Sequence, residues 1–334
     1  MPLRPPTVLV LVAVLLAGCL PAAAPVSLTV YSGRSQELVG PLFERFTNET
    51  GIRIEARYGD SAELAALLVE EGANSPADVY FSQDAGSLGA VAAAGLLEPL
   101  PPELLQRVPA PFRSDEGEWV GVSGRARVLV YDSRELSTGD LPQSVDELIE
   151  PAWRGRIGWA PTNGSFQAFV TAYRLMRGDD AARAWLTGMA GNQPRRYEGN
   201  SAIVQAVADG EVDVGLVNHY YLLRAIAEQG SDFPVRNHFF EGSDPGALIN
   251  VAGAGLLATS RNRDAAERLL EFLLSADAQT YFAEQTSEYP LVAGVEGPAG
   301  VPPLAALAAP QVDLSNLADL GGTLRLLNDT GVLP

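Results

Sequence analysis

Residues 26–95 alternate between short segments with strand-like patterning and longer segments with helical spacing. Apolar and polar side chains alternate at 26–31, 52–58 and 76–81, and helical spacing occurs at 36–50, 61–71 and 86–95. In the order βαβαβα each strand is joined to the next by a helix, which produces a parallel sheet with helices on its faces. The sequence therefore predicts an α/β fold.

The rest of the chain contains a second series of the same kind. Strand patterns occur at 121–131, 155–159, 212–217 and 250–258. Helical patterns occur at 141–150, 165–177, 181–190, 201–209, 221–229, 263–274, 276–284 and 314–328. The 334 residues correspond to two domains at about 150 residues each. No linker separates the two series, so we expect two α/β lobes that share crossing strands.

The N-terminal residues have the pattern of an export signal. Arg4 precedes an apolar run at 8–17 that is shorter than the ~20 residues needed to span a bilayer. The run ends in Leu-Ala-Gly-Cys, which resembles the bacterial lipobox, where cleavage leaves a cysteine to be acylated. We expect a signal peptide at 1–18, lipidation of Cys19 and a tether at 19–26. An incidental cysteine beside an ordinary cleavage site is the alternative.

Charge and composition exclude several classes of function. Asp and Glu number 41 against 23 basic residues, all of them Arg, and the net charge is −18. This negative charge argues against binding to nucleic acid and against electrostatic docking on an anionic membrane. The absence of Lys excludes Schiff-base chemistry and the P-loop. Two His and one Cys exclude a Cys/His zinc site and give little support to a surface hydrolase with a Ser-His-Asp site.

One polar cluster, Asn218-His219-Tyr220-Tyr221, lies where a predicted strand gives way to a helix. Ligands of open α/β sheets bind beyond the carboxyl ends of strands. Two converging phenols suit a hard, highly charged Lewis acid that can displace a proton of pKa about 10, and ferric iron fits that description. A tyrosine pair used only for packing is the alternative. We expect His219 to be a packed, neutral histidine.

Iron held by two phenolates needs a further anion, and candidate anion ligands are visible in the sequence. The turn at 162–165 precedes a predicted helix, whose N-terminal N–H groups would bind a small oxyanion. Arg34 and Arg125 lie in turn or strand segments from which they could bind the same anion in bidentate fashion. Surface salt bridges are the alternative for both arginines, and a simple N-cap role is the alternative for Asn200.

The order and spacing of these motifs resemble those of bacterial ferric-iron-binding proteins, the extracytoplasmic receptors that supply ABC transporters. The resemblance runs from about residue 27 to 292. It rests on the segments 30–34, 75–79, 123–131, 151–155, 162–166, 200–201, 218–221, 244–247 and 288–291.

The resemblance implies a two-lobed type II periplasmic-binding-protein fold with a hinge of two crossing strands and a ligand cleft between the lobes. It places 27–124 and about 250–300 in the N-lobe, and about 125–249 and 301–334 in the C-lobe. It also implies a monomeric receptor, without enzymatic activity, that binds ferric iron and an ABC permease. The implied iron ligands are Tyr220 and Tyr221. The implied ligands of a synergistic carbonate or phosphate are Arg125, Asn163, Gly164, Ser165 and Asn200, with Arg34 as a further candidate.

The sequence departs from better-known members of the family at three positions. Ser35 and Gln83 stand where some members have a His and a Glu ligand, and Asn163 stands where others have a third tyrosine. The remaining iron ligands must therefore come from the anion, from water or from a nearby group such as Gln83, Asp84 or Asn218. The alternative function keeps the fold and changes the cargo to an iron chelate, thiamine, a polyamine or a small oxyanion.

Overall fold

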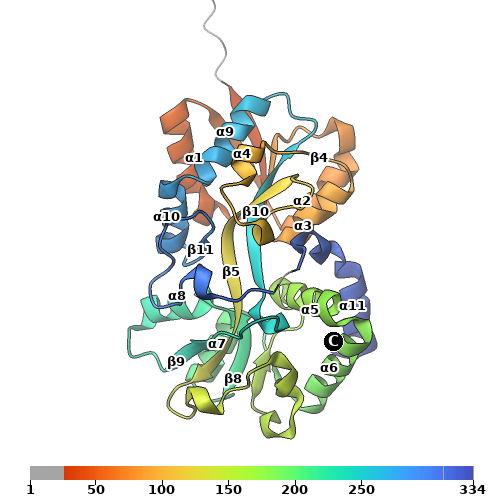
Figure 1. Cartoon of the computed structure of the whole chain (residues 1–334), viewed down its shortest axis with the longest axis vertical. Helices are drawn as coiled ribbons and strands as arrows, with labels where there is room; N and C mark the ends of the chain where they lie inside the picture. The colour runs from red at the N-terminus through yellow and green to blue at the C-terminus, as the bar shows by residue number, and fades with distance from the viewer. Residues whose placement is uncertain (1–25, 311, 334) are drawn as a thin grey trace, which may run out of the picture.

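Two long strands, β5 (Trp119–Asp132) and β10 (Ile249–Leu257), connect an upper and a lower lobe in the computed structural model of the chain (Figure 1). The structure describes residues 26–310 and 312–333. The predicted signal peptide, Cys19 and most of the predicted tether lie outside the described residues. Within the described part, no helix is both long and apolar enough to cross a membrane.

The N-lobe is the upper lobe of Figure 1 and contains the predicted parallel strands. β1 pairs in parallel with β2 and β3, and β10 continues this sheet in antiparallel orientation. The elements of this lobe are β1 (Ser27–Ser32), α1 (Gln36–Thr50), β2 (Arg53–Tyr58), α2 (Ser61–Glu71), η1 (Gly72–Asn74), β3 (Val79–Ser82), α3 (Ala85–Ala93), β4 (Leu97–Glu98), α4 (Pro102–Leu105), η2 (Ala110–Phe112), α9 (Arg263–Leu273), α10 (Ala276–Gln285), β11 (Tyr289–Pro290) and η7 (Leu304–Ala306).

The C-lobe is the lower lobe and continues the sheet in the order β5-β8-β6-β7. β6 pairs in parallel with β7 and β8, whereas β5 is antiparallel to β8 and β9. Its elements are η3 (Thr138–Asp140), η4 (Val145–Ile149), η5 (Pro151–Trp153), β6 (Ile157–Trp159), α5 (Gly164–Arg177), α6 (Asp179–Gly191), β7 (Arg195–Arg196), α7 (Asn200–Ala208), β8 (Val214–Asn218), α8 (Tyr220–Gln229), β9 (Val235–His238), η6 (Pro245–Ala247) and α11 (Leu320–Asp329).

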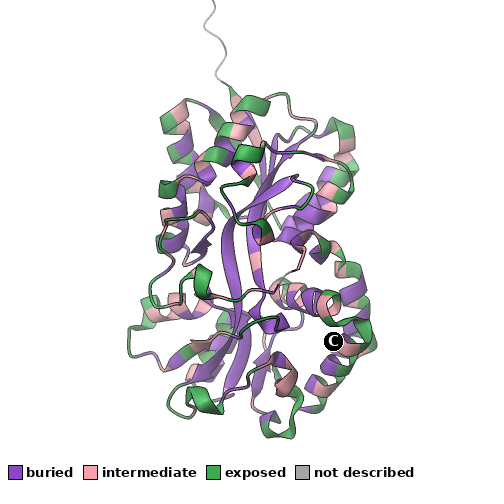
Figure 2. Ribbon diagram, in the orientation of Figure 1, coloured by how far each residue is buried: buried purple, intermediate pink, exposed green. Residues whose placement is uncertain are grey.

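The hinge consists of the two crossing strands that the resemblance implied. The N-terminal part of β5 pairs with β10 and β11, and its C-terminal part pairs with β8 and β9. Every residue of β5 is buried, and Figure 2 shows both strands buried along almost their whole length. β5 therefore contributes to the cores of both lobes, whereas the core residues of β10 belong to the N-lobe core, and a single sheet runs through the molecule.

Two helices differ from the sequence prediction. Residues 141–150 form only the short 3₁₀ helix η4, which Ser144 caps and which ends before Pro151, because a residue that precedes proline disfavours helical geometry. The predicted helix at 314–328 is divided into η8 (Leu314–Ala318) and α11 at Asp319, whose side chain caps α11.

The segment after residue 301 contacts both lobes, although we expected all of 301–334 to belong to the C-lobe. η8 packs on α3, and its Leu317 belongs to the N-lobe core. α11 packs on α5 and α6, and its Leu327 belongs to a C-lobe core. The other lobe boundaries remain a prediction.

The close packing of η8 on α3 depends on Gly89. A Cβ added at Gly89 would lie 2.1 Å from the carbonyl oxygen of Ser315. We predict that Gly89→Ala destabilises the protein by about 1–3 kcal/mol, the usual cost of overpacking, even though alanine favours a helix. Gly40→Ala in α1 is the matched control, since its nearest neighbour would be 3.4 Å away. Urea unfolding measures both variants. A Gly89→Ala variant as stable as Gly40→Ala would contradict the prediction.

Candidate functional site

A cleft of about 1190 Å³ lies between the lobes, and residues of both lobes and of the hinge line it. Many of the residues singled out in the sequence lie on its walls: Gln83, Asp84, Arg125, Asn163, Gly164, Ser165, Asn218, Tyr220 and Tyr221. Arg34 and Asn200 do not line it. The fold therefore brings most of the predicted site residues to one place.

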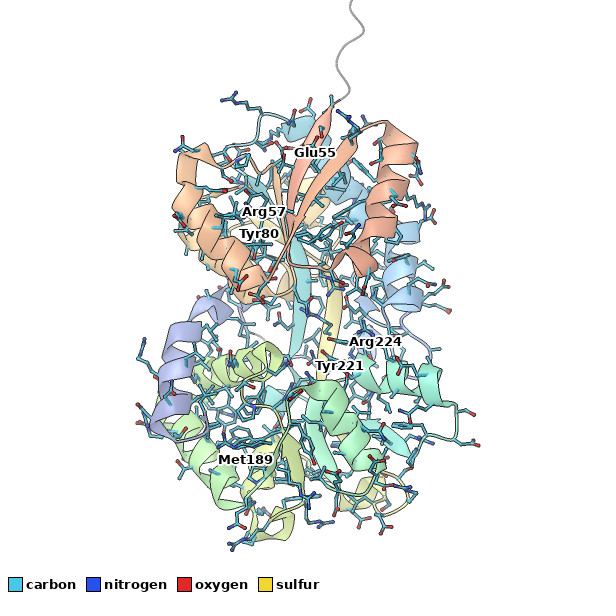
Figure 3. All side chains as sticks on the ribbon, turned by 180° about the vertical axis from the view of Figure 1, so that it is seen from behind. Glu55, Arg57, Tyr80, Met189, Tyr221 and Arg224 are labelled. Carbon is cyan, nitrogen blue, oxygen red and sulfur yellow. The ribbon has the colours of Figure 1, made fainter. Side chains whose placement is uncertain are left out.

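The tyrosine pair lies at the start of α8, and only His219 separates this helix from the end of β8. The two rings stack with their centroids 4.3 Å apart and an angle of 28° between their planes. Tyr220 is only 5% exposed, whereas Tyr221 is half-buried. Figure 3 shows Tyr221 at the level between the two lobes. The strand-to-helix junction thus presents two adjacent phenols to the cleft.

The phenol of Tyr220 is protonated at neutral pH in the metal-free protein. Burial raises its pKa well above 10, the neighbouring Tyr221 raises it further, and the positive charge of Arg125 partly opposes both effects. The guanidinium of Arg224 lies 4.6 Å from the centroid of the Tyr220 ring, in a cation–π arrangement. The charge of Arg125 therefore favours the deprotonated form of this phenol, and Arg224 places a second positive charge over its ring.

Arg127 is a cleft residue that the sequence reasoning missed. Its guanidinium lies 5.7 Å from the centroid of Phe166 and 5.3 Å from that of Phe169, and it donates to Ser165 Oγ over 3.4 Å. Burial lowers its pKa to about 9, so the group stays charged at neutral pH. Period-two spacing from Arg125 places both side chains on the same face of β5. This spacing was the signal that could have identified Arg127.

Three of the predicted anion ligands form one hydrogen-bonded group at the start of α5. Asn163 caps the helix, and its Oδ1 accepts from the N–H of Ser165 (3.0 Å) and from Ser165 Oγ (2.6 Å). Asn200 Nδ2 donates to both Asn163 Oδ1 and Ser165 Oγ, each over 3.2 Å. Asn200 is not the N-cap of α7, because Gly199 occupies that position. Its amide instead joins the starts of α5 and α7.

Gly164 and Asn218 complete the part of the predicted site that lies in the C-lobe. Gly164 is the first residue of α5, and a Cβ added there would meet nothing within 4 Å. The backbone at this helix start is therefore open to a small anion. Asn218 is the last residue of β8, is almost fully buried and pairs in register with Arg127.

Arg34 lies in the interior of the protein. Its Nη2 donates to Glu288 Oε1 over 2.8 Å, and both side chains are 1% exposed. Its Nη1 donates to Gln83 Oε1 over 3.3 Å. Burial would raise the pKa of Glu288, but the charges of Arg34 and Arg125 together with the hydrogen bonds from Ser123 and Arg34 outweigh burial, and the pKa lies below its usual value. The charge of Arg34 is thus balanced inside the protein, and its role as an anion ligand stays a prediction.

The buried pair of Arg34 and Glu288 supports a prediction about stability. Arg34→Met leaves the Glu288 carboxylate buried without the arginine that pairs with it, so we expect the free energy of unfolding to fall by about 3–5 kcal/mol. The double variant Arg34→Met/Glu288→Met removes both charges and should lose less. Urea unfolding monitored by circular dichroism compares the three proteins. A double variant less stable than the single one would contradict this account.

The N-lobe wall of the cleft offers few free ligands. Asp84 caps α3, and its carboxylate accepts from the N–H (2.8 Å) and the hydroxyl (2.9 Å) of Ser87. The backbone carbonyl of Gln83 accepts from the guanidinium of Arg125. Across 26–310 and 312–333, no group of three or more His, Cys, Asp or Glu side chains could hold a metal ion.

His219 confirms the prediction of a packed, neutral histidine. Its side chain is fully buried, and burial lowers its pKa to about 4. The imidazole is therefore uncharged at neutral pH and does not repel a cation bound at the neighbouring tyrosines.

Residues 74–313 match the family model described as bacterial extracellular solute-binding protein. The chain belongs to this family. It is 38% identical over 326 residues to the major ferric iron-binding protein of Neisseria meningitidis, a match that covers 95% of this chain and 97% of the relative. Members of the family are transport receptors that bind solutes outside the cytoplasm.

Solved structures of family members have the same fold. Iron-bound HitA from Pseudomonas aeruginosa is 36% identical and superposes with a TM-score of 0.83, covering 92% of this chain and 100% of HitA. A Trichodesmium FutA in complex with iron and citrate is 31% identical with a TM-score of 0.82, covering 91% of this chain and 99% of FutA. These matches confirm the expected type II periplasmic-binding-protein fold with two α/β lobes.

Proposed function

We propose that the chain is an extracytoplasmic receptor that captures ferric iron and delivers it to an ABC importer. The stacked pair Tyr220 and Tyr221 on the cleft wall carries this proposal. Phenolate oxygen is a hard ligand, and a trivalent cation can displace a proton from a phenol. The relatives named for ferric iron support this cargo.

Charge balance explains why an anion should accompany the iron. Two phenolates neutralise two of the three positive charges of ferric iron, and Arg125 and Arg127 add positive charge to the same cleft. A carbonate or phosphate at the start of α5 would accept from Arg127 and from backbone N–H groups of the helix. We therefore assign the anion to the group formed by Asn163, Gly164, Ser165 and Asn200.

The N-lobe wall favours a chelated form of iron as the second candidate cargo. The side chain of Gln83 accepts from Arg34, and the backbone carbonyl of Gln83 accepts from Arg125. Asp84 caps a helix. A hydroxycarboxylate carried with the iron could occupy the coordination positions that these residues do not fill. The iron and citrate in the Trichodesmium relative support this candidate.

The cellular setting follows from the N-terminal sequence. We infer export, acylation at Cys19 and attachment by lipid alone at the outer face of the cell membrane or in the periplasm. The receptor would act as a monomer, and its partner would be an ABC permease. We assign it no catalytic activity, because its family consists of transport receptors that bind solutes.

Titration of the purified, metal-free protein with ferric iron tests the proposal. We expect one iron per chain and a visible phenolate-to-iron charge-transfer band. Titrations with ferric nitrilotriacetate plus carbonate, with ferric nitrilotriacetate plus phosphate, and with ferric citrate separate the candidate anions from a chelate. Absence of the band with every iron source would refute iron as the cargo. Thermal stabilisation by thiamine, a polyamine or a small oxyanion without colour would identify the alternative.

A further inference from the structure

His219, the single residue between β8 and α8, uses every polar atom that it has. Its N–H donates to the carbonyl of Ala126 (3.0 Å), and its own carbonyl accepts from Asn237 Nδ2 (3.1 Å). In the ring, Nδ1 accepts from the N–H of Ala126 (3.2 Å), and Nε2 lies 2.9 Å from the carbonyl oxygen of Ser287. Four hydrogen bonds therefore fix this residue to three segments that are distant in the sequence.

These partners determine the tautomer of the imidazole. Nδ1 receives a proton from a backbone N–H, so it has none of its own. The carbonyl of Ser287 can only accept, so Nε2 carries the proton. The ring therefore accepts a hydrogen bond from the hinge strand β5 and donates one to the loop between α10 and β11.

The ring of His219 also fills the space beside the tyrosine pair. It packs on Tyr289 with centroids 4.7 Å apart and the planes tilted by 34°, and it meets Tyr220 edge-on at 5.9 Å and 87°. The side chain has no exposed surface. Tyr220 therefore has His219 on one side, Tyr221 stacked at 4.3 Å and the guanidinium of Arg224 at 4.6 Å from its centroid.

The loop that accepts from His219 belongs to the N-lobe and is itself held firmly. Ser287 has a φ of 58°, a left-handed conformation that is uncommon for serine. The next residue, Glu288, binds Arg34 (2.8 Å) and Ser123 Oγ (2.5 Å), and Tyr289 pairs with Gly124 in β5. His219 thus attaches the start of a C-lobe helix to a fixed N-lobe loop at the hinge.

We propose that His219 is a positioning residue for Tyr220, which it holds through its two ring hydrogen bonds in the orientation that binds the metal. The inference rests on the proposed function of the tyrosine pair as the iron site. Because α8 starts directly after His219, its ring bonds set where the helix begins relative to β5 and the 286–289 loop. A phenol held in place before iron arrives loses less conformational freedom on binding.

Two substitutions separate hydrogen bonding from ring packing. His219→Phe keeps an aromatic ring and removes both ring bonds, whereas His219→Gln keeps an N–H that can reach the carbonyl of Ser287. His238→Gln is the matched control. His238 is the only other histidine, lies on β9 outside the cleft lining, and also contacts a backbone carbonyl, that of Pro142, through Nε2.

We expect His219→Phe to lower the affinity for ferric iron about 10–100-fold, the usual loss when an outer partner of a metal ligand is removed. The charge-transfer band should shift, and iron should be lost faster to excess chelator. His219→Gln should recover part of the affinity, and His238→Gln should match wild type. Wild-type affinity, band position and release rate in His219→Phe would overturn the proposal.

Measurements on the metal-free protein keep this proposal separate from the proposed function. Nitrogen-15 NMR with labelled histidine should show the Nε2–H tautomer for His219. Amide hydrogen exchange should accelerate at 219–222 and 286–289 in His219→Phe and stay unchanged there in His238→Gln. An Nδ1–H tautomer, or unchanged exchange in His219→Phe, would refute the positioning role. Absence of the iron band in wild type would refute the proposed function and the metal-binding part of this proposal, whereas the tautomer and the hydrogen exchange would still test whether His219 holds the start of α8 in place.

Discussion

Replacing Tyr220 with phenylalanine should abolish most of the visible charge-transfer band and lower the affinity for ferric iron by more than about 100-fold. Removal of an outer partner of a metal ligand typically costs 10–100-fold, and removal of the ligand itself should cost more. Tyr220→Phe deletes one oxygen and keeps the ring, so the stacking on Tyr221 at 4.3 Å and the contact with Arg224 are retained. The loss of affinity can then be attributed to the missing phenolate.

The companion variants make this prediction specific to the pair. Tyr221→Phe should have a similar effect, and Tyr220→Phe/Tyr221→Phe should have no band. Tyr58→Phe is the control, because Tyr58 lines the same cleft from the N-lobe and the proposal gives it no part in binding iron. Band intensity at saturating ferric citrate and a competition titration measure the effects. A band that persists in the double variant, or one that disappears in Tyr58→Phe, would contradict the assignment.

The sequence alone allowed the site to be located because its main residues lie at the ends of regular elements. A strand pattern at 212–217 followed by a helix predicts where Tyr220 and Tyr221 emerge, and parallel topology places this edge beside the turn at 162–165. The structure brings Asn163, Ser165 and Asn200 together there. Local patterning, together with the rule that ligands bind beyond the carboxyl ends of strands, was sufficient to predict that these residues lie close together.

Other features of the site depend on contacts between distant parts of the chain. The role of Arg34 as an anion ligand stays a prediction, but its pairing with Glu288, 254 positions later in the sequence, was not foreseen. No local pattern identifies such a partner, because the pairing depends on where the loop at 286–289 lies in the fold. The division of the C-terminal segment between the two lobes has the same origin. The sequence of this segment showed its helical spacing, but it did not show which surfaces of the two lobes the segment packs against.

Iron binding should weaken steeply as the pH falls. Each tyrosine must lose a proton before it can bind iron, the ordinary phenol pKa is about 10, and burial raises that of Tyr220 further. Below the ordinary pKa of a phenol, each proton that the metal displaces lowers the apparent affinity about 10-fold per pH unit, so two phenolates give about 100-fold per unit. Between pH 8 and pH 6 the affinity should thus fall by about 10⁴-fold from the tyrosines alone.

Direct proton counting tests this prediction without depending on the chelator. A ferric salt is added to weakly buffered, metal-free protein, and the released protons are counted by pH-stat. After subtraction of the protons that iron and anion release without protein, two protons per iron should come from the tyrosines. Tyr220→Phe should release fewer. The positive charge of Arg125 reduces the cost of deprotonating Tyr220, but burial raises the pKa of Tyr220 by more than Arg125 lowers it. An affinity independent of pH, with less than one proton released, would mean that the phenols do not bind the iron as phenolates.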